Sequence, residues 1–435
     1  MDVGRVLKRI NRRSIKMIQA MYSGVSGMKA FKADLDVIGN NIANINTVGY
    51  KVGRATFKEM LNQTIAGATS PSSGRGGTNP SQVGLGVVIG SIDVNLSQGS
   101  MQATGRQTDL AIEGNGFFAL GDGSNTLYTR DGTFGLDAQY NLVSASTGLK
   151  VLGWNADSTT GIVDTATPVT GASGIKIPVG GMSLARQTSA INVGGNLNAS
   201  AIKDDTYKIK FSVYDSLGLD HETQITFTKM DTDPVTNEAQ WGYKVSVPDA
   251  DPTDVATGTI KFDDKGHSTV KNVDISFDLS DSNGSITPLT AKIDFSDVSQ
   301  LNGIDTVDLT YQDGLPMGTL EGYTIGRDGL VSGTFSNGSS RALGQIALAE
   351  FNNASGLAKA GNNLLRESPN SGTARIATPG TGSCGLIAAG FLEASNVDLA
   401  NEFSNMIVAQ RGFQANSRII TVSDEVLQEL VSLKR

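Results

Sequence analysis

The sequence predicts a mainly β protein with one helix at each end, and the N- and C-terminal helices are expected to pair as a coiled coil. Three observations predict this fold class. Apolar residues near both termini recur at steps of three and four, short alternating segments separated by Gly, Asn and Asp fill the middle, and neither helix has a helical neighbour in sequence. We therefore expect nested β domains between the helices, with an outer β domain inserted in the inner one.

The first stretch, residues 1–20, is interpreted as an N-terminal extension or tail. It carries six Lys and Arg side chains but no apolar core and no small-residue cleavage site, so it lacks the pattern of a secretory signal. These basic residues could bind anionic lipid or RNA. Alternatively, the stretch is a solvated tail, or translated sequence upstream of a start at Met17 or Met21.

The first helix is expected within 21–50, where apolar residues alternate steps of three and four. This spacing is that of a heptad seam, in which one stripe of a helix packs against another helix. Gly49 tolerates positive φ and is expected to mark the end of the helix. The predicted seam is Met28, Phe31, Leu35, Ile38, Ile42 and Ile45.

Asparagines are unexpectedly frequent at the end of this helix. Asparagine is a mediocre helix former, because its amide competes for backbone hydrogen bonds. The residues are Asn40, Asn41, Asn44 and Asn46.

The last helix is expected within 391–435, with Asp398 or Asn396 as its cap. Apolar residues recur every seven positions, although part of the stripe is polar. Gly412 lies in mid-helix at a cost of about 1 kcal/mol, which indicates close approach by a neighbour. The apolar repeat is Met406, Phe413, Ile420 and Leu427, and Gln410 belongs to the polar part of the stripe. The residues expected to take part in self-assembly are Phe403, Met406, Gln410, Phe413, Ile420 and Leu427.

The expected domains follow from these patterns and from Gly- and Ser-rich stretches near both helices. A lone helix pair is marginal, so we expect packing against further copies to stabilise it. The expected divisions are a helical domain of 21–50 and 391–435, flexible connecting segments at 51–87 and 357–390, an inner β domain of 88–187 and 311–356, and an inserted outer β domain at 188–310.

Composition limits the possible functions. The net charge of −8 argues against a nucleic-acid partner, and the single cysteine, Cys384, allows no intramolecular disulfide. The two histidines, His221 and His267, lie far apart without signalled partners. The glycines of 380–385 lack the strand that a dinucleotide site requires and are interpreted as a hinge at the helix base. We expect no catalytic, cofactor or metal site.

Three segments carry a family resemblance. "MYSGVSGMKAFKADLDVIGNNIANINTVGYK" (21–51) and "SNVDLANEFSNMIVAQRGFQANSRIITVSDEVLQEL" (395–430) closely resemble the terminal segments of the bacterial flagellar axial proteins of rod and hook. "VNLSQGSMQATGRQTDLAIEGNGFFAL" (94–120) looks like the first β domain that these proteins share. The large insertion favours a hook member over the shorter rod members.

The resemblance implies a self-polymerising subunit of a flexible tubular joint that transmits torque from rod to filament. It also implies export through the flagellar type III apparatus without signal cleavage. The implied partners are further copies of the chain, the distal rod protein, the hook–filament junction protein and the hook cap. A distal-rod protein, or an exported adhesin or enzyme with flagellar-type ends, remains as the alternative.

Within such an assembly the asparagines at the end of the first helix could have either of two roles. Amides both donate and accept, so they could join identical subunits. They could also cap and solvate the end of the helix, where left-handed residues are tolerated.

Overall fold

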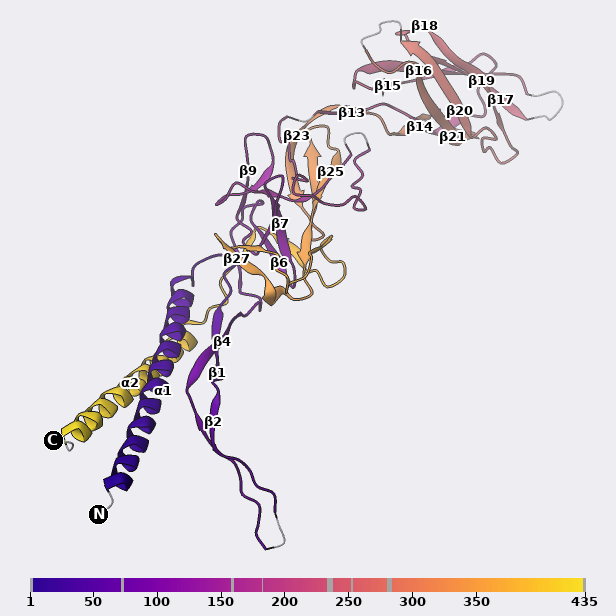
Figure 1. Ribbon diagram of the computed structural model, residues 1–435. Coiled ribbons are helices and arrows are strands. Elements are labelled where there is room, and N and C mark those ends of the chain that lie inside the picture. Colours follow the sequence, from indigo (N-terminus) through magenta and orange to yellow (C-terminus); the bar gives the residue numbers. More distant parts are fainter. Residues whose placement is uncertain are drawn as a thin grey trace. The chain divides into compact units, whose positions relative to one another are not determined.

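The computed structural model describes residues 3–71, 74–157, 160–181, 183–232, 238–251, 253–279 and 284–432. The chain forms two compact units (Figure 1). The first comprises Met1–Ile177, Ile325–Val331 and Ala342–Arg435, and the second comprises Pro178–Thr324 and Ser332–Arg341. The chain therefore leaves the first unit, builds the second and returns, and the expected insertion at 188–310 lies within the second unit.

The two helices belong to the first unit and lie against each other, as predicted from the terminal heptads (Figure 1). Helix α1 spans Val3–Ala43 and helix α2 spans Leu399–Ser432. The expected extension is thus helical from residue 3 onward. Helix α1 ends before Gly49, which lies in the following turn. The φ of Gly49 is 69°, positive as expected.

A two-stranded hairpin follows α1, where a flexible segment at 51–87 was expected. Strand β1 (Gly53–Glu59) pairs with β4 (Val87–Val94), and β2 (Asn62–Ala66) pairs with β3 (Ser81–Gly84). Only the tip around the Thr69–Thr78 bridge keeps the low-complexity character seen in the sequence. The many Val and Ile residues of β4 favour strand structure there.

A nine-stranded sheet forms the body of the first unit. Its main order is β27-β28-β8-β7-β11-β10-β9, and β26 pairs with both β7 and β29. The strands are β7 (Phe117–Gly121), β8 (Thr126–Thr129), β9 (Phe134–Leu136), β10 (Leu142–Ser144), β11 (Lys150–Val151), β26 (Leu348–Glu350), β27 (Ala358–Gly361), β28 (Leu364–Arg366) and β29 (Arg375–Ala377).

The segment 357–390, expected as a second flexible connection, therefore belongs to this β body. Strand β30 (Leu386–Ala389) also pairs with β6 (Leu110–Glu113), and β31 (Phe391–Glu393) pairs with β5 (Met101–Ala103). Leu364 and Ile387 are buried. Short strands with buried apolar residues outweigh the turn-rich composition of this segment.

Five further strands form one sheet in the order β12-β25-β24-β23-β13. Strand β12 (Gly153–Asn155) pairs with β25 (Ser340–Ile346), and β13 (Ser183–Arg186) pairs with β23 (Leu315–Ile325). Strand β24 (Leu330–Phe335) lies between β23 and β25 in sheet order.

The second unit contains two sheets around one apolar core, which includes Trp241, Phe227 and Phe295. The five-stranded sheet runs β18-β20-β21-β14-β22 and the four-stranded sheet runs β15-β16-β17-β19. A turn at residues 215–219 joins β15 to β16. The strands are β14 (Ala190–Asn198), β15 (Thr206–Tyr214), β16 (Asp220–Lys229), β17 (Ala239–Ser246), β18 (Ala250–Asp251), β19 (Asp254–Phe262), β20 (Asn272–Leu279), β21 (Leu289–Leu301) and β22 (Asp308–Gln312).

Candidate functional site: the helix pair and its junction with the β body

The two helices approach closely because glycines replace larger residues at their contact. A Cβ at Gly412 would lie 2.5 Å from the ring of Phe31, and a Cβ at Gly27 would lie 2.7 Å from the side chain of Asn416. The close approach inferred from Gly412 in the sequence is confirmed. The ring of Phe31 also lies 5.8 Å from that of Phe57 on β1, so α1 packs between α2 and the hairpin.

On α1 the predicted seam faces the interior. Ile38 is 4% exposed, and the other predicted apolar residues of the stripe are partly buried. These partly buried residues are Met28, Phe31, Leu35, Ile42 and Ile45.

On α2 the residues expected to take part in self-assembly differ in their exposure. Met406, Ile420 and Leu427 are partly buried, whereas Phe403 is 50% exposed and Phe413 is 37% exposed. Gln410 is also exposed, so Phe403 and Gln410 lie outside the intramolecular seam.

A second repeat of seven residues completes the α2 seam, and apolar periodicity could not find it. Its members are small or polar, and Gly24 and Gly27 of α1 leave room for one of them, Asn416. Glu402, Ala409 and Ser423 are buried and Asn416 is partly buried.

Asn41 is the buried connector of three elements at this site. Its Nδ2 donates to the carbonyl oxygen of Gly53 at 2.8 Å and to Glu402 Oε2 at 3.1 Å. Its Oδ1 accepts from the Gly53 amide at 3.0 Å and from the Tyr50 hydroxyl at 3.2 Å. The side chain is 2% exposed, so Asn41 acts within the subunit and ties α1 to β1 and α2.

The other three asparagines differ in role: one caps the end of the helix, and two are exposed where a neighbouring subunit could contact them. Asn44 Nδ2 donates to the carbonyl oxygen of Asn40 at 2.8 Å and to Asn40 Oδ1 at 2.6 Å, which caps the last turn of α1. Asn40 and Asn46 are exposed. A contact to neighbouring subunits remains a prediction for these two residues.

Two acidic side chains lie together in the seam. Burial and the nearby charge of Glu402 raise the pKa of Asp34. The same two causes, with burial again the larger, raise the pKa of the Tyr50 hydroxyl. Both shifts show that a further negative charge beside Glu402 is unfavourable in this partly buried place.

A buried ion cluster fixes the junction between the helices and the β body. Glu393 is fully buried, with Oε1 2.6 Å from Lys51 Nζ and Oε2 3.3 Å from Arg130 Nη1. Lys51 also donates to the Ser97 carbonyl at 2.8 Å. Burial lowers the pKa values of Lys51 and Arg130, while Glu393 opposes both shifts. No sequence pattern relates these three positions, which lie far apart along the chain.

The return of the chain into α2 is held by the two residues proposed as caps. Asp398 Oδ1 accepts from the Ala400 amide at 2.9 Å and is the cap of α2. Asn396 instead accepts from the Val52 amide at 2.8 Å and donates to the Asn95 carbonyl at 2.9 Å. Asn396 thus ties the start of α2 to the strands of the hairpin.

Both histidines considered in the sequence lie beside acidic residues. His221 is buried, with Nδ1 3.3 Å from Asp249 and Nε2 3.7 Å from Asp215. The amide of His267 donates to Asp263 at 2.7 Å. Among the described residues no group of three or more His, Cys, Asp or Glu side chains could hold a metal ion.

Cys384 is buried, and burial together with Glu350 raises the pKa of its thiol. The glycine-rich segment around it leads into strand β30, so the expected hinge at a helix base is wrong. Within the described part of the chain, no helix has the length and apolar character needed to cross a membrane.

Comparison with known families places four segments of the chain. The Flagella basal body rod protein family matches residues 21–51, and the Flagellar hook protein FlgE/F/G D1 domain matches 111–199. The Flagellar basal body protein FlaE D2 domain matches 184–315, and the Flagellar basal body rod FlgEFG protein C-terminal family matches 388–433.

Full-length relatives agree with these families. The chain is 37% identical to the flagellar hook protein FlgE of Treponema pallidum, over 96% of this chain and 100% of that protein. It is 35% identical to the flagellar basal-body rod protein FlgG of Bacillus subtilis, with the same coverage. The structure of Helicobacter pylori FlgE2 matches with a TM-score of 0.50 at 16% identity, covering 67% of this chain and 100% of that one, and supports the fold. The chain therefore belongs to the family of flagellar hook proteins and is a structural subunit of the bacterial flagellar hook.

Proposed function

We propose that copies of this chain polymerise through the helix pair and the adjacent hairpin into a flexible tube that transmits torque from rod to filament. The observation that carries the proposal is the apolar surface left on α2 after it has paired with α1. Contiguous exposed apolar surface on a soluble domain indicates an interface. The exposed apolar residues of α2 include Phe403, Ile407, Val408, Ile419, Val422 and Val426.

The hairpin supports the same proposal. A two-stranded ribbon is marginal in water unless another surface covers it. Leu61, Ile65 and Ile92 are more than half exposed on this ribbon or beside it. Burial of these side chains by neighbouring copies would stabilise both the ribbon and the polymer.

The polymer is expected to connect to the distal rod protein, the hook–filament junction protein and the hook cap. Its subunits are expected to leave the cell through the flagellar type III apparatus without cleavage of a signal. The mass of the secreted chain tests the second point, because an uncleaved subunit retains the N-terminus at which translation started.

Electron microscopy of cells lacking the gene tests the function directly. Basal bodies with rods but without hooks are expected, and complementation should restore curved hooks. A straight polymer at the rod position would instead identify a distal-rod protein, and intact hooks in the deletion strain would refute the proposal.

A further inference from the structure

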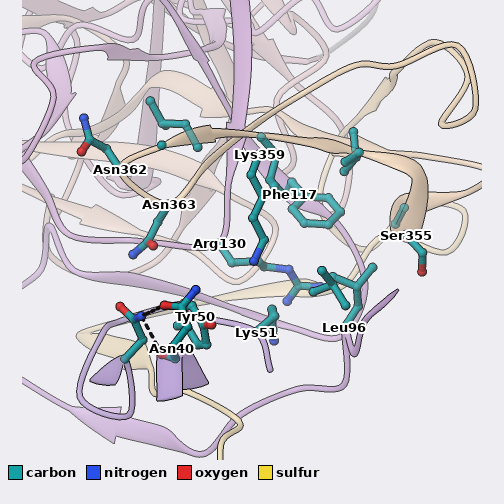
Figure 2. Close-up of a pocket in the computed structure, with 18 residues that line it drawn as sticks. Asn40, Tyr50, Lys51, Leu96, Phe117, Arg130, Ser355, Lys359, Asn362 and Asn363 are labelled. Atoms are coloured by element: carbon teal, nitrogen blue, oxygen red, sulfur yellow. Dashed lines mark hydrogen bonds between the residues drawn. The ribbon is translucent and has the colours of Figure 1, made fainter. Parts of the chain in front are cut away.

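A pocket of about 260 Å³ is lined by Lys51 and Arg130, the two cations of the buried ion cluster (Figure 2). The end of α1, the segment around Tyr50, β7 and the β27–β28 turn all contribute to it. Its lining contains three cationic side chains, Lys51, Arg130 and Lys359, and no Asp or Glu. The pocket is therefore electropositive.

The buried part of the cluster has more positive than negative charge. Lys51 and Arg130 share the single carboxylate of Glu393. That carboxylate also accepts from the Gly99 amide at 2.8 Å, so both of its oxygens are already engaged. Two cations and one anion leave a net positive charge in a poorly solvated place, where an uncompensated charge raises the free energy.

Arg130 retains unused capacity to donate a hydrogen bond. Its Nη2 donates to the Gly114 carbonyl at 2.7 Å, and its guanidinium lies 5.3 Å from the ring centroid of Phe117. The Nε atom is buried and has no hydrogen-bond partner among the described residues, although the side chain is only 7% exposed. Most buried donors in folded proteins have a partner, so this N–H can still pair with an acceptor that a ligand brings into the pocket.

Lys359 lies at the mouth of the pocket. Its Nζ is 5.5 Å from the ring centroid of Tyr50, and Figure 2 shows the side chain extending toward Arg130. The residue itself is exposed. Lys359 can therefore contact a ligand that also reaches Arg130, and it can be replaced without disturbing the core.

The other walls of the pocket are largely apolar. They include Val94, Leu96, Leu357, Leu364 and Leu365. A carboxylate on a short aliphatic stem fits both features, because its oxygens would pair with the cations and its methylenes would lie against the leucines.

We propose that this pocket receives an Asp or Glu side chain from a second copy of the chain. This inference rests on the proposed polymerisation. The chain offers an excess of such groups, with 43 Asp and Glu residues against 35 Lys and Arg residues. The pocket also adjoins the end of α1, which belongs to the proposed assembly surface. A carboxylate in the pocket couples the contact between copies to the junction that holds the helices on the β body.

Charge reversal at the mouth tests the contact. Lys359→Glu should raise the monomer concentration needed for polymerisation about tenfold, the loss expected for one charge-assisted contact, and Lys359→Gln should have an intermediate effect. Lys176→Glu, at an exposed lysine of the same unit outside the pocket, should polymerise like the unaltered chain. All three monomers should keep the thermal unfolding midpoint of the unaltered monomer.

Zero-length cross-linking identifies the source of the carboxylate. Polymers assembled from a mixture of ¹⁴N- and ¹⁵N-labelled chains are treated with a carbodiimide and analysed by mass spectrometry. An amide bond between Lys359 of one isotope and an Asp or Glu of the other is expected. Cross-links at other lysines but not at Lys359, together with normal polymerisation of Lys359→Glu, would overturn the inference while leaving the proposed function intact.

Acetate titration distinguishes a site for free small carboxylates. The inference would also be overturned if acetate shifted the Arg130 Nε–H resonance of the monomer to a saturating value and no interchain cross-link formed at Lys359. Failure of the unaltered chain to polymerise under any condition would count against the proposed function itself.

Discussion

The second unit and the helical region of the first unit bury apolar residues in opposite ways. In the second unit, two sheets enclose a continuous core that includes Phe211, Phe227, Trp241 and Phe295. In the helix pair, few apolar side chains are fully buried, among them Ile38 and Ala409, and exposed apolar residues are numerous. Both regions also expose large apolar residues, among them Ile202 and Ile304 in the second unit. Only the second unit has a continuous apolar core of its own, so we expect the helical region to depend more on contacts with further copies.

The largest expected effect comes from a charge in the helical seam. Ile38→Asp places an unpaired carboxylate at a site that is 4% exposed, which costs several kcal/mol. Polymerisation should be lost, while unfolding of the second unit should remain unchanged, as measured by sedimentation and by hydrogen exchange in β15–β17. Leu427→Asp, on the other helix, should have the same effect. Normal polymers from either variant would show that polymerisation does not depend on the helical seam.

A substitution in the buried ion cluster should have the next largest effect. Glu393→Gln leaves Lys51 and Arg130 without their shared carboxylate, a change that typically costs about 3–5 kcal/mol. Glu222→Gln is the matched control, because the Glu222–Lys210 pair is exposed and such pairs contribute about 0–1 kcal/mol. Chemical denaturation of the two variants should separate them clearly, and equal free energies of unfolding would contradict the structural role of Glu393.

The glycine contact between the helices offers a smaller test. A methyl group in Gly412→Ala would meet the Phe31 ring at 2.5 Å, and overpacking of this kind typically costs about 1–3 kcal/mol. Gly39→Ala is the control, since its methyl would meet nothing within 4 Å and should stabilise α1 by about 1 kcal/mol. We expect opposite shifts in the hydrogen-exchange protection of α1. Stabilisation by both substitutions would show that the helices do not pack closely at Gly412.

The smallest effect concerns pH. Because the pKa of Asp34 is raised by burial and by Glu402, the folded state binds this proton more tightly than the unfolded state. Helix protection should therefore increase as the pH falls from 7 through the folded pKa of Asp34. Asp34→Asn should increase protection at pH 7 and reduce this pH dependence. An unchanged pH profile in the variant would assign the dependence to another group.

Local periodicity was sufficient to predict the two helices, their pairing and the β character between them. It missed the seam positions Glu402 and Asn416, because their burial depends on partners on α1 and not on hydrophobicity. Glu402 accepts a hydrogen bond from Asn41, and Asn416 lies against Gly27. It could not pair Lys51 with Glu393, since that contact depends on how distant strands meet. Local composition predicted flexible segments at 51–87 and 357–390, where the structure has strands. Turn-rich composition is also compatible with short strands whose register is fixed by long-range pairing.

Hydrogen exchange measured on the monomer and on the assembled polymer tests whether the helical region forms the contact between copies. We expect exchange in α1, α2 and the β1–β4 hairpin to slow strongly on polymerisation, because neighbouring copies bury their exposed apolar residues. Exchange in the core strands β15–β17 of the second unit should stay the same. Helices that are as protected in the monomer as in the polymer would show that they do not form this contact.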